Sequence, residues 1–159
     1  MSTAEAIRGH AVVMQPDEGP SYWQPVPANG HADPKLFPAN TRFEGLAMGY
    51  QTIAPGAHVR AHSHGDQVEL QICFRGRGRV VVDGEHHPLV PGTACFLGYD
   101  VKPEIVNESA DELVRLWVIT PPGLKTFFPS IGRPRQTGAP APARSPARRT
   151  SSRSSAPWA

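Results

Sequence analysis

The sequence has only two cysteines, Cys73 and Cys95, and no long hydrophobic run. Two cysteines make no disulfide framework, and in a chain with no other sign of secretion we read them as reduced thiols. No stretch of 18 apolar residues exists, which excludes a membrane-spanning helix. The apolar run 11–14 near the N-terminus is too short for a signal peptide. These absences predict a cytoplasmic protein with no membrane partner.

Acidic residues are absent beyond Gly132, where six arginines lie. Removing those six charges from the formal net charge of +2 leaves residues 1–132 at −4. The body of the chain is therefore mildly acidic and offers no basic surface to nucleic acid. From Arg133 onward, Pro, Ala, Ser and Arg dominate without apolar periodicity. We therefore expect residues 133–159 to form a disordered basic tail.

Proline and glycine, by contrast, are abundant, with 18 and 15 residues in a chain of 159. So turn-rich a chain favours many short strands over helices, and its length suits one domain. Turn signals recur about every ten residues, and Asp83-Gly84 between two apolar runs predicts a tight hairpin. The pattern predicts an all-β, antiparallel jelly-roll barrel. Its expected strands cover 42–54, 57–64, 68–74, 79–82, 94–98, 104–107 and 112–120.

The chain divides into a Pro-punctuated N-terminal arm (1–42), a barrel (43–132) and the tail. The arm holds one strand candidate, 11–15. The last barrel strand, 112–120, is apolar at Leu113, Leu116 and Val118. Beyond that strand, apolar side chains recur at the spacing of one helix face, which predicts a short C-terminal helix: Leu124, Phe127, Phe128 and Ile131.

The most informative stretch contains His62, His64 and Glu69. On an extended strand, side chains at i and i+2 share a face about 7 Å apart, so the rings of His62 and His64 can lean toward one point. Glu69 has the wrong parity for the same unbroken strand, but Gly65-Asp66 is a turn signal. A new strand over 68–74 would bring Glu69 back beside the histidines. Two His and one carboxylate form the facial triad typical of non-haem iron sites.

This stretch resembles the first motif of the cupin superfamily, which has a Pro-Gly turn, a His-x-His pair, a Glu and a closing Gly: here Pro55-Gly56, His62, His64, Glu69 and Gly76. A second motif follows in most of its positions, from Pro91-Gly92 to Asn107. The position of the family's third metal histidine holds Pro103, which cannot ligate a metal. The resemblance spans roughly residues 43–120 and implies a small, single-domain jelly-roll cupin.

The resemblance and the spacing together imply one divalent ion bound by His62, His64 and Glu69. Two nitrogens and one oxygen suit Fe(II) or Zn(II) first, with Mn(II) and Ni(II) also open. Arg60 shares the parity of His62, and Gln71 that of Glu69, so both are candidate cavity residues, with ordinary barrel lining as the other reading. The alternative is a barrel that has lost its metal and kept these ligands as polar lining, although three polar groups inside a narrow barrel are costly without a partner.

Cupins include dioxygenases, decarboxylases, isomerases, lyases and ligand-sensing domains, so the fold does not fix the function. The first hypothesis is a metal-dependent enzyme acting on a small oxygen-bearing organic molecule, with dioxygenase as the reaction class named and isomerase or lyase as further options. The second is a non-catalytic small-molecule binding or sensing cupin, which Pro103 favours. We also expect a homodimer, with Tyr22 and Trp23 of the arm supplying apolar surface.

Overall fold

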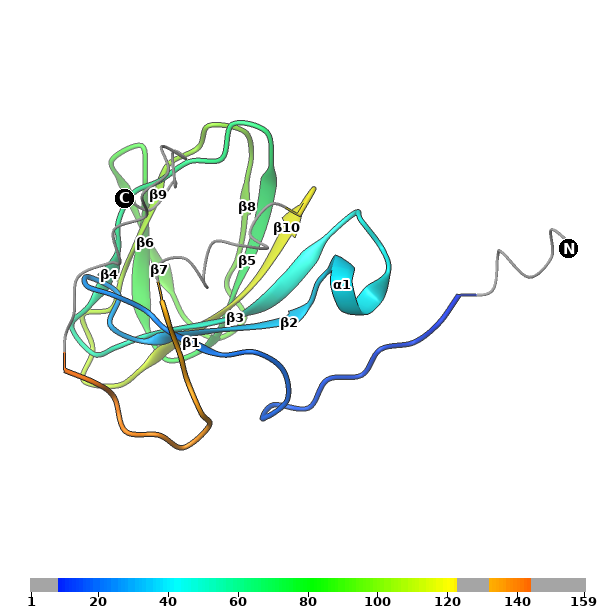
Figure 1. Ribbon diagram of the computed structural model, residues 1–159. Coiled ribbons are helices and arrows are strands. Elements are labelled where there is room, and N and C mark those ends of the chain that lie inside the picture. Colours follow the sequence, from blue (N-terminus) through cyan, green and yellow to red (C-terminus); the bar gives the residue numbers. More distant parts are fainter. Residues whose placement is uncertain (1–8, 123–131, 144–159) are drawn as a thin grey trace, which may run out of the picture.

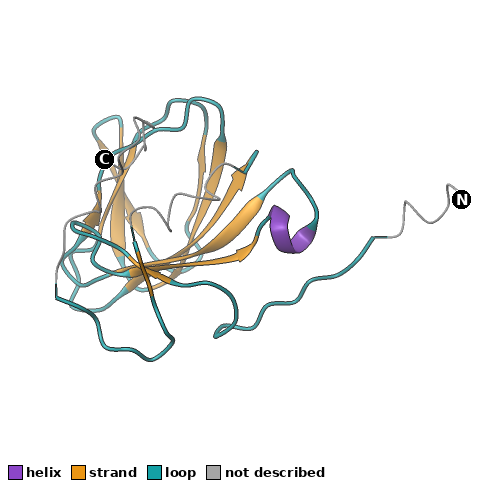
Figure 2. Cartoon of the chain, in the orientation of Figure 1, coloured by secondary structure: helices purple, strands orange, loops and turns teal. Residues whose placement is uncertain are grey.

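The structure, a computed structural model, describes residues 9–122 and 132–143. In these residues the regular elements are strands, apart from one short helix, α1 (Pro38–Thr41) (Figure 2). The described part contains no helix that is both long enough and apolar enough to cross a membrane. The C-terminal helix predicted over 124–131 lies outside the described residues.

Two antiparallel sheets face each other and form the barrel (Figure 1). This arrangement confirms the predicted all-β jelly roll. The larger sheet has the strand order β11-β1-β2-β3-β10-β5-β8, and the smaller sheet has the order β4-β9-β6-β7. The strands are β1 (Tyr22–Trp23), β2 (His31–Leu36), β3 (Ala47–Ile53), β4 (His58–Val59), β5 (Val68–Arg75), β6 (Gly78–Val82), β7 (Glu85–Leu89), β8 (Ala94–Leu97), β9 (Pro103–Val106), β10 (Leu113–Thr120) and β11 (Arg133–Pro134).

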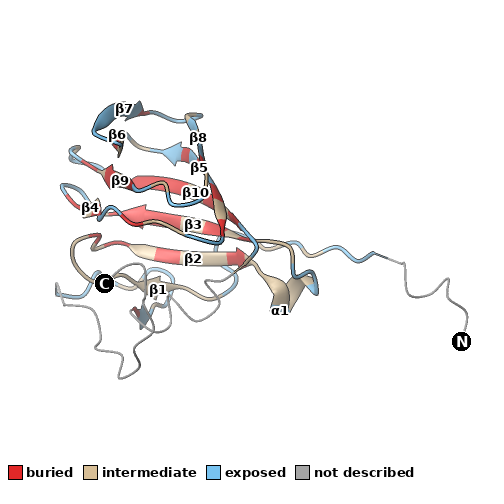
Figure 3. Cartoon of the chain, turned by 90° about the horizontal axis from the view of Figure 1, so that it is seen from above, coloured by how far each residue is buried: buried red, intermediate tan, exposed pale blue. Residues whose placement is uncertain are grey.

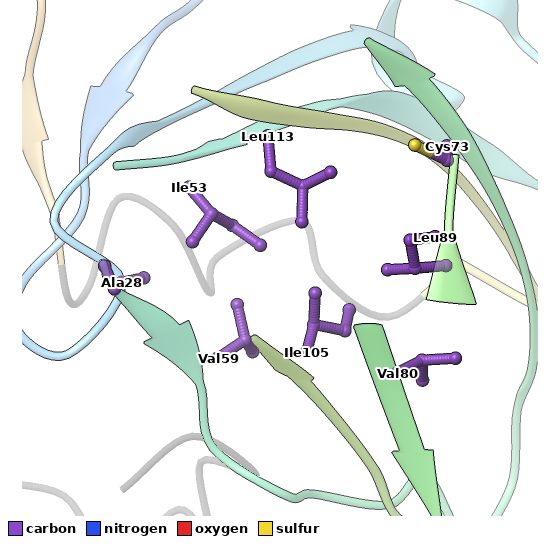
Figure 4. Packing of buried hydrophobic residues seen from close by; sticks show 9 residues of the cluster. Ala28, Ile53, Val59, Cys73, Val80, Leu89, Ile105 and Leu113 are labelled. Carbon is purple, nitrogen blue, oxygen red and sulfur yellow. The ribbon is translucent and has the colours of Figure 1, made fainter. Parts of the chain in front are cut away.

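An apolar core fills the space between the two sheets (Figure 4). Ile53 and Leu113 enter it from the larger sheet, and Ile105 enters it from the smaller sheet; all three are 0% exposed. Burial of one such side chain stabilises the fold by roughly 1.5–3 kcal/mol. Buried residues also run along β3 and β10, in the middle of the larger sheet (Figure 3). The core therefore fixes the spacing of the sheets that carry the site.

A tight turn and a buried side-chain amide hold the ends of neighbouring strands in place around the core. Asp83 and Gly84 have φ values of 50° and 80° and join β6 to β7, as the predicted two-residue hairpin requires. Asn107, which directly follows β9, is fully buried, and its Nδ2 donates to the carbonyls of Ile53 and Ala54 at 3.0 and 3.1 Å. The amide thus joins the end of β9 to the end of β3.

The segment that holds the two histidines differs from the strand expected over 57–64. β4 ends at Val59, and residues 60–67 form no regular element. Only His58 and Val59 pair with a neighbour, β9, so the ladder stops before the histidines. An irregular connection between the two sheets therefore positions them.

The N-terminal arm contributes to the larger sheet, because β2 pairs with β3 and β1 pairs with β2. The strand expected over 11–15 does not form. Instead, the buried Lys35 ammonium donates to backbone carbonyls of this part of the arm, those of Gln15 (3.1 Å), Pro16 (2.9 Å) and Glu18 (2.5 Å). Residues 15–18 of the arm are therefore held to β2 through one charged side chain.

The start of the expected tail is also part of the sheet. Arg133 and Pro134, which we expected in the disordered tail, form β11 and pair with β1. The Arg135 guanidinium lies 5.0 Å from the Trp23 ring centroid, and the His31 ring packs edge-on against the same indole at 5.8 Å. The apolar surface of Trp23 that we expected to serve a dimer is thus partly covered within the chain.

Candidate metal centre

The three predicted ligands lie together in the interior. Glu69 is the second residue of β5 and faces inward, while His62 and His64 come from the connection before β5. Their ligand atoms all lie within 4.8 Å of one another, with 3.7 Å between His64 Nε2 and Glu69 Oε2. Neighbouring ligands with bonds of about 2.1 Å lie roughly 3 Å apart around an ion. Small side-chain rotations therefore suffice to close the group on a metal.

His62 is held in the tautomer that a metal ligand needs. Its Nδ1 lies 2.8 Å from the Arg60 carbonyl oxygen, which can only accept, so Nδ1 carries the proton and Nε2 the lone pair. Burial, with the positive charge of Arg115 and the neighbouring His64, lowers the pKa of His62 to about 3 from its ordinary 6.5. The imidazole is therefore neutral at physiological pH.

His64 stays neutral for a similar reason. Burial lowers its pKa, although the negative charge of Glu69 acts in the opposite direction. The two rings lie 5.4 Å apart between centroids and nearly perpendicular, at 83°. The site thus presents two neutral imidazoles and one carboxylate.

Arg115 is the site residue that sequence reasoning missed. It lies on β10, is 4% exposed, and its Nη1 donates to Glu69 Oε1 at 3.3 Å. Its Nε donates to Gln51 Oε1, which holds the guanidinium in place. Burial lowers the pKa of Arg115, and the adjacent Glu69 carboxylate opposes that shift. Strand parity groups Arg115 with the apolar Leu113 and Trp117, but the opposite face of β10 carries Leu116 and Val118, so the sequence did not show which of the two faces is the inner one.

Of the two predicted cavity residues, Gln71 is buried and Arg60 is exposed. Gln71, 4% exposed, faces the interior from β5, and its Nε2 has no hydrogen-bond partner among the described residues. A buried donor without a partner is costly, so Gln71 is suited to bind a ligand. Arg60 is exposed, and its contribution to the site is the backbone carbonyl that orients His62.

Pro103 occupies an interior position, as the family pattern requires of the third histidine. It is the first residue of β9, is buried and shares its strand face with the fully buried Ile105. Glu104 points to the other face. In the part of the chain that the structure describes, the group of potential ligand residues therefore contains two histidines and one glutamate.

These residues fit a divalent metal ion. Neutral imidazoles and a carboxylate suit Fe(II), Zn(II), Mn(II) or Ni(II), and the geometry does not choose among the four. The Arg60 carbonyl acts as the outer partner that metal-bound histidines usually have.

Comparison with known proteins bears on the family and the fold of this chain. A family model described as a cupin domain matches residues 49–119. Three similar solved structures are a sugar phosphate isomerase of the cupin superfamily from Silicibacter pomeroyi (20% identity, 69% of this chain and 75% of that chain, TM-score 0.59), a predicted oxalate decarboxylase from Thermotoga maritima (21%, 70% and 100%, 0.61), and an RmlC-like cupin from Shewanella frigidimarina (16%, 70% and 93%, 0.57).

No curated protein matches the chain. The identities to the three solved structures are low, so this likeness shows the fold and not the activity. Together, the family match, the barrel and the structural neighbours show that residues 49–119 of this chain form a cupin domain.

Proposed function

We propose that this cupin is a metal-dependent enzyme that acts on a small oxygen-bearing organic molecule. The observation that supports the proposal best is the buried convergence of His62, His64 and Glu69 within 4.8 Å. Three protein ligands leave further coordination positions, which substrate oxygens can fill. Gln71, with its buried and unpartnered Nε2, adds a donor to the same interior face as Glu69.

Dioxygenase is the reaction class we propose, because two His and one carboxylate are the ligand set of many non-haem iron oxygenases. Bound Fe(II) would supply O2 activation, and Zn(II) would instead supply Lewis-acid polarisation of a carbonyl. The chain's own residues would hold the ion and orient the substrate. The hydrogen bond from His62 Nδ1 to the Arg60 carbonyl fixes the orientation of the imidazole ring. Glu69 supplies a negative charge that attracts the metal ion. Gln71 Nε2 would donate a hydrogen bond to a substrate oxygen.

We also propose that the substrate is an anion such as a carboxylate or an enolate. The charges of Glu69 and Arg115 cancel, so a divalent ion leaves the buried site with two positive charges. A negative substrate offsets that charge, and the attraction is stronger in a buried site than in water. Two of the similar solved proteins are named for oxalate and sugar phosphate, which are both small oxygen-bearing anions.

The test is to purify the chain without an affinity tag, measure its metal content, and follow oxygen uptake with β-diketones and catechols. We expect close to one iron per chain and oxygen uptake that depends on it. His64→Ala should lose both the metal and the uptake, since it removes one of three ligands. An iron-loaded protein that consumes no oxygen with any of these substrates would remove the dioxygenase assignment.

A second candidate is a non-catalytic cupin that binds or senses a small molecule. Two observations favour it: Glu69 already has a charged partner in Arg115, at 3.3 Å, and Pro103 stands at the position of the third histidine. Protein that purifies without metal but with a bound small molecule would support this reading. Metal content and bound molecules, measured on the same preparation, therefore separate the two functions.

A further inference from the structure

A chain of hydrogen-bonded side chains runs from the N-terminal arm to Glu69 of the metal centre. Gln24 directly follows β1, Gln51 lies on β3, and Arg115 lies on β10. Gln51 Nε2 donates to Gln24 Oε1, and Arg115 Nε donates to Gln51 Oε1. Arg115 Nη1 then donates to Glu69 Oε1 at 3.3 Å. Two amides and one guanidinium thus connect the arm to a metal ligand.

Both ends of this chain of bonds fix the same orientation of the two amides. A guanidinium has no acceptor, so Gln51 must turn its oxygen to Arg115 and its NH2 group to Gln24. Gln24 must then turn its oxygen to Gln51 and its Nε2 to the Thr52 carbonyl, which can only accept, at 3.1 Å. The Gln24 backbone is itself held, since its N–H donates to the Gly30 carbonyl at 2.8 Å. Neither amide can therefore flip without losing both of its hydrogen bonds.

The bonds nearest the metal centre lie inside the protein, where water does not compete for them. Gln51 is 2% exposed, and Arg115 and Glu69 are each 4% exposed. Arg115 pairs with Gln51 in the register of β3 and β10, whereas Glu69 pairs with Ile119, four residues further along β10. The Arg115 side chain therefore extends along the sheet, with its Nε held by Gln51 and only its tip reaching Glu69. The position of the guanidinium thus depends on Gln51.

The distances show which of its two partners holds Arg115 more closely. Its Nε lies 2.5 Å from Gln51 Oε1, whereas its Nη1 lies 3.3 Å from Glu69 Oε1. A charge-assisted N–H···O bond is usually about 2.7–2.9 Å long, and arginine often binds both oxygens of a carboxylate at once. Here Glu69 Oε2 accepts no hydrogen bond from the described residues, and it lies 3.7 Å from His64 Nε2. One oxygen of Glu69 therefore remains available on the side of the histidines.

We propose that Gln24 and Gln51 are positioning residues of the metal centre. They hold the Arg115 guanidinium back from Glu69, so that one carboxylate oxygen stays available to bind the ion. Without Gln51 the guanidinium would close on both oxygens and compete with the ion for Glu69. Gln24 acts one step further away, because it keeps the Gln51 amide turned toward Arg115. Their role rests on the metal-binding function proposed above, and it makes the N-terminal arm a working part of the metal centre.

The test is to strip the full chain of metal with a chelator and titrate it with Co(II), measuring the dissociation constant by competition with a chromophoric chelator. Gln51→Met keeps the length of the side chain but removes the acceptor of Arg115 Nε. We expect it to raise the dissociation constant about tenfold, as the loss of an outer partner of a metal ligand does. Gln24→Met should raise it by a smaller factor, because Arg115 keeps its direct partner. Gln24 is only partly buried, so this second variant should keep the circular dichroism spectrum of the wild type.

Gln51→Glu separates a positioning role from a merely structural one. Both Gln51→Met and Gln51→Glu lose the hydrogen bond to Gln24, but the carboxylate of Gln51→Glu still accepts from Arg115 Nε. We therefore expect Gln51→Glu to bind Co(II) at least as tightly as the wild type. The matched control is Lys35→Met, which releases residues 15–18 of the arm and touches neither amide. It should leave the dissociation constant for Co(II) unchanged.

The results also separate this role from the metal-binding function itself. A wild type that binds Co(II), with a folded Gln51→Met variant that binds it equally tightly, would overturn the positioning role and leave the metal site standing. Where Gln51→Met does not fold, unchanged affinity in Gln24→Met has the same meaning. Equal weakening by Gln51→Met and Gln51→Glu would also overturn the role, since the loss would then be one of packing. A wild type that binds no Co(II) would overturn the metal-binding function and the positioning role together.

Discussion

Two arginine–glutamate pairs in this protein have the same N–O distance, 3.3 Å, but very different surroundings. The side chains of Arg115 and Glu69 are 4% and 5% exposed, whereas those of Arg75 and Glu112 are 66% and 50% exposed. Water screens and solvates the charges of Arg75 and Glu112, so either side chain can stay charged without the other. Arg115 and Glu69 have little access to water, so each of the two charges is stabilised chiefly by the other.

Arg115→Met is therefore expected to lower the unfolding free energy of the metal-free protein by about 3–5 kcal/mol, because Glu69 is left buried without a partner. Arg75→Met, the matched control, should cost less than about 1 kcal/mol. Urea denaturation followed by circular dichroism measures both. Added divalent metal should restore part of the loss in Arg115→Met, since the ion becomes the partner of Glu69. Equal costs for the two variants would contradict this account.

His62 gives the metal-free protein a defined acid sensitivity. Its folded pKa of about 3 lies below the ordinary 6.5, so between these values the unfolded chain binds a proton that the folded chain does not. Stability from this residue is fully present above pH 6.5 and is lost as the pH falls toward 3. His62→Gln should reduce the slope of unfolding free energy against pH by up to about 1.4 kcal/mol per unit in this window. Urea titrations on both sides of pH 6.5 measure the slope, and identical slopes in both proteins would exclude His62 as the source.

At the scale of strands, alternation explains which site residues the sequence could show. On β5 the inward residues Glu69 and Gln71 are polar and their outward neighbours are apolar, so alternation separates the two faces, and the spacing of Glu69 from the two histidines, rather than hydrophobicity, marks the polar face as the inner one. On β10 the outward Leu116 and Val118 are apolar as well. Because both faces of β10 look alike, the apolar pattern did not single out Arg115. The apolar side chains Leu116 and Val118 on the outward face of β10 are thus the physical reason why one site residue was missed.

The histidines show the opposite case, in which the residues were found although the element was wrong. We predicted that His62 and His64 lie on one continuous strand, 57–64, but residues 60–67 are irregular. Isolated hydrogen bonds, rather than a ladder, hold this connection: Asp100 N donates to the His64 carbonyl at 3.0 Å, and Gln67 Nε2 donates to the Pro121 carbonyl at 2.8 Å. Local spacing identifies ligands, whereas the path between strands depends on contacts far along the sequence.

The parity of β9 leads to a prediction about the missing third histidine. Pro103 is buried and shares a face with Ile105, so Pro103→His should place an imidazole in the interior and raise metal retention. Glu104→His, one residue along, is the matched control and should leave retention unchanged because it faces the other way. Metal content after dialysis against a weak chelator measures the difference. Similar retention in both variants would mean that position 103 does not reach the ion.

At the scale of the whole molecule, the site lies where the connection between the two sheets meets the larger sheet. His62 and His64 belong to that connection, and Glu69 and Arg115 belong to β5 and β10, which pair with each other. β5 also pairs with β8, so it is held on both edges. A bound ion would therefore tie the irregular connection to a firmly paired part of the barrel.

Metal binding should consequently stabilise the entire fold, since the unfolded chain does not preserve the group of ligands. At a free ion concentration of 100 times the dissociation constant, the gain is about 2.7 kcal/mol. For a domain of this size that raises the melting temperature by about 5–10 °C. Differential scanning fluorimetry with Fe(II) or Zn(II) measures the shift. His64→Ala should abolish it, whereas His87→Ala, at a position 53% exposed in the β6–β7 hairpin, should keep it. Equal shifts in both variants would place the ion away from His62, His64 and Glu69, because only one of the two changes removes a ligand of that group.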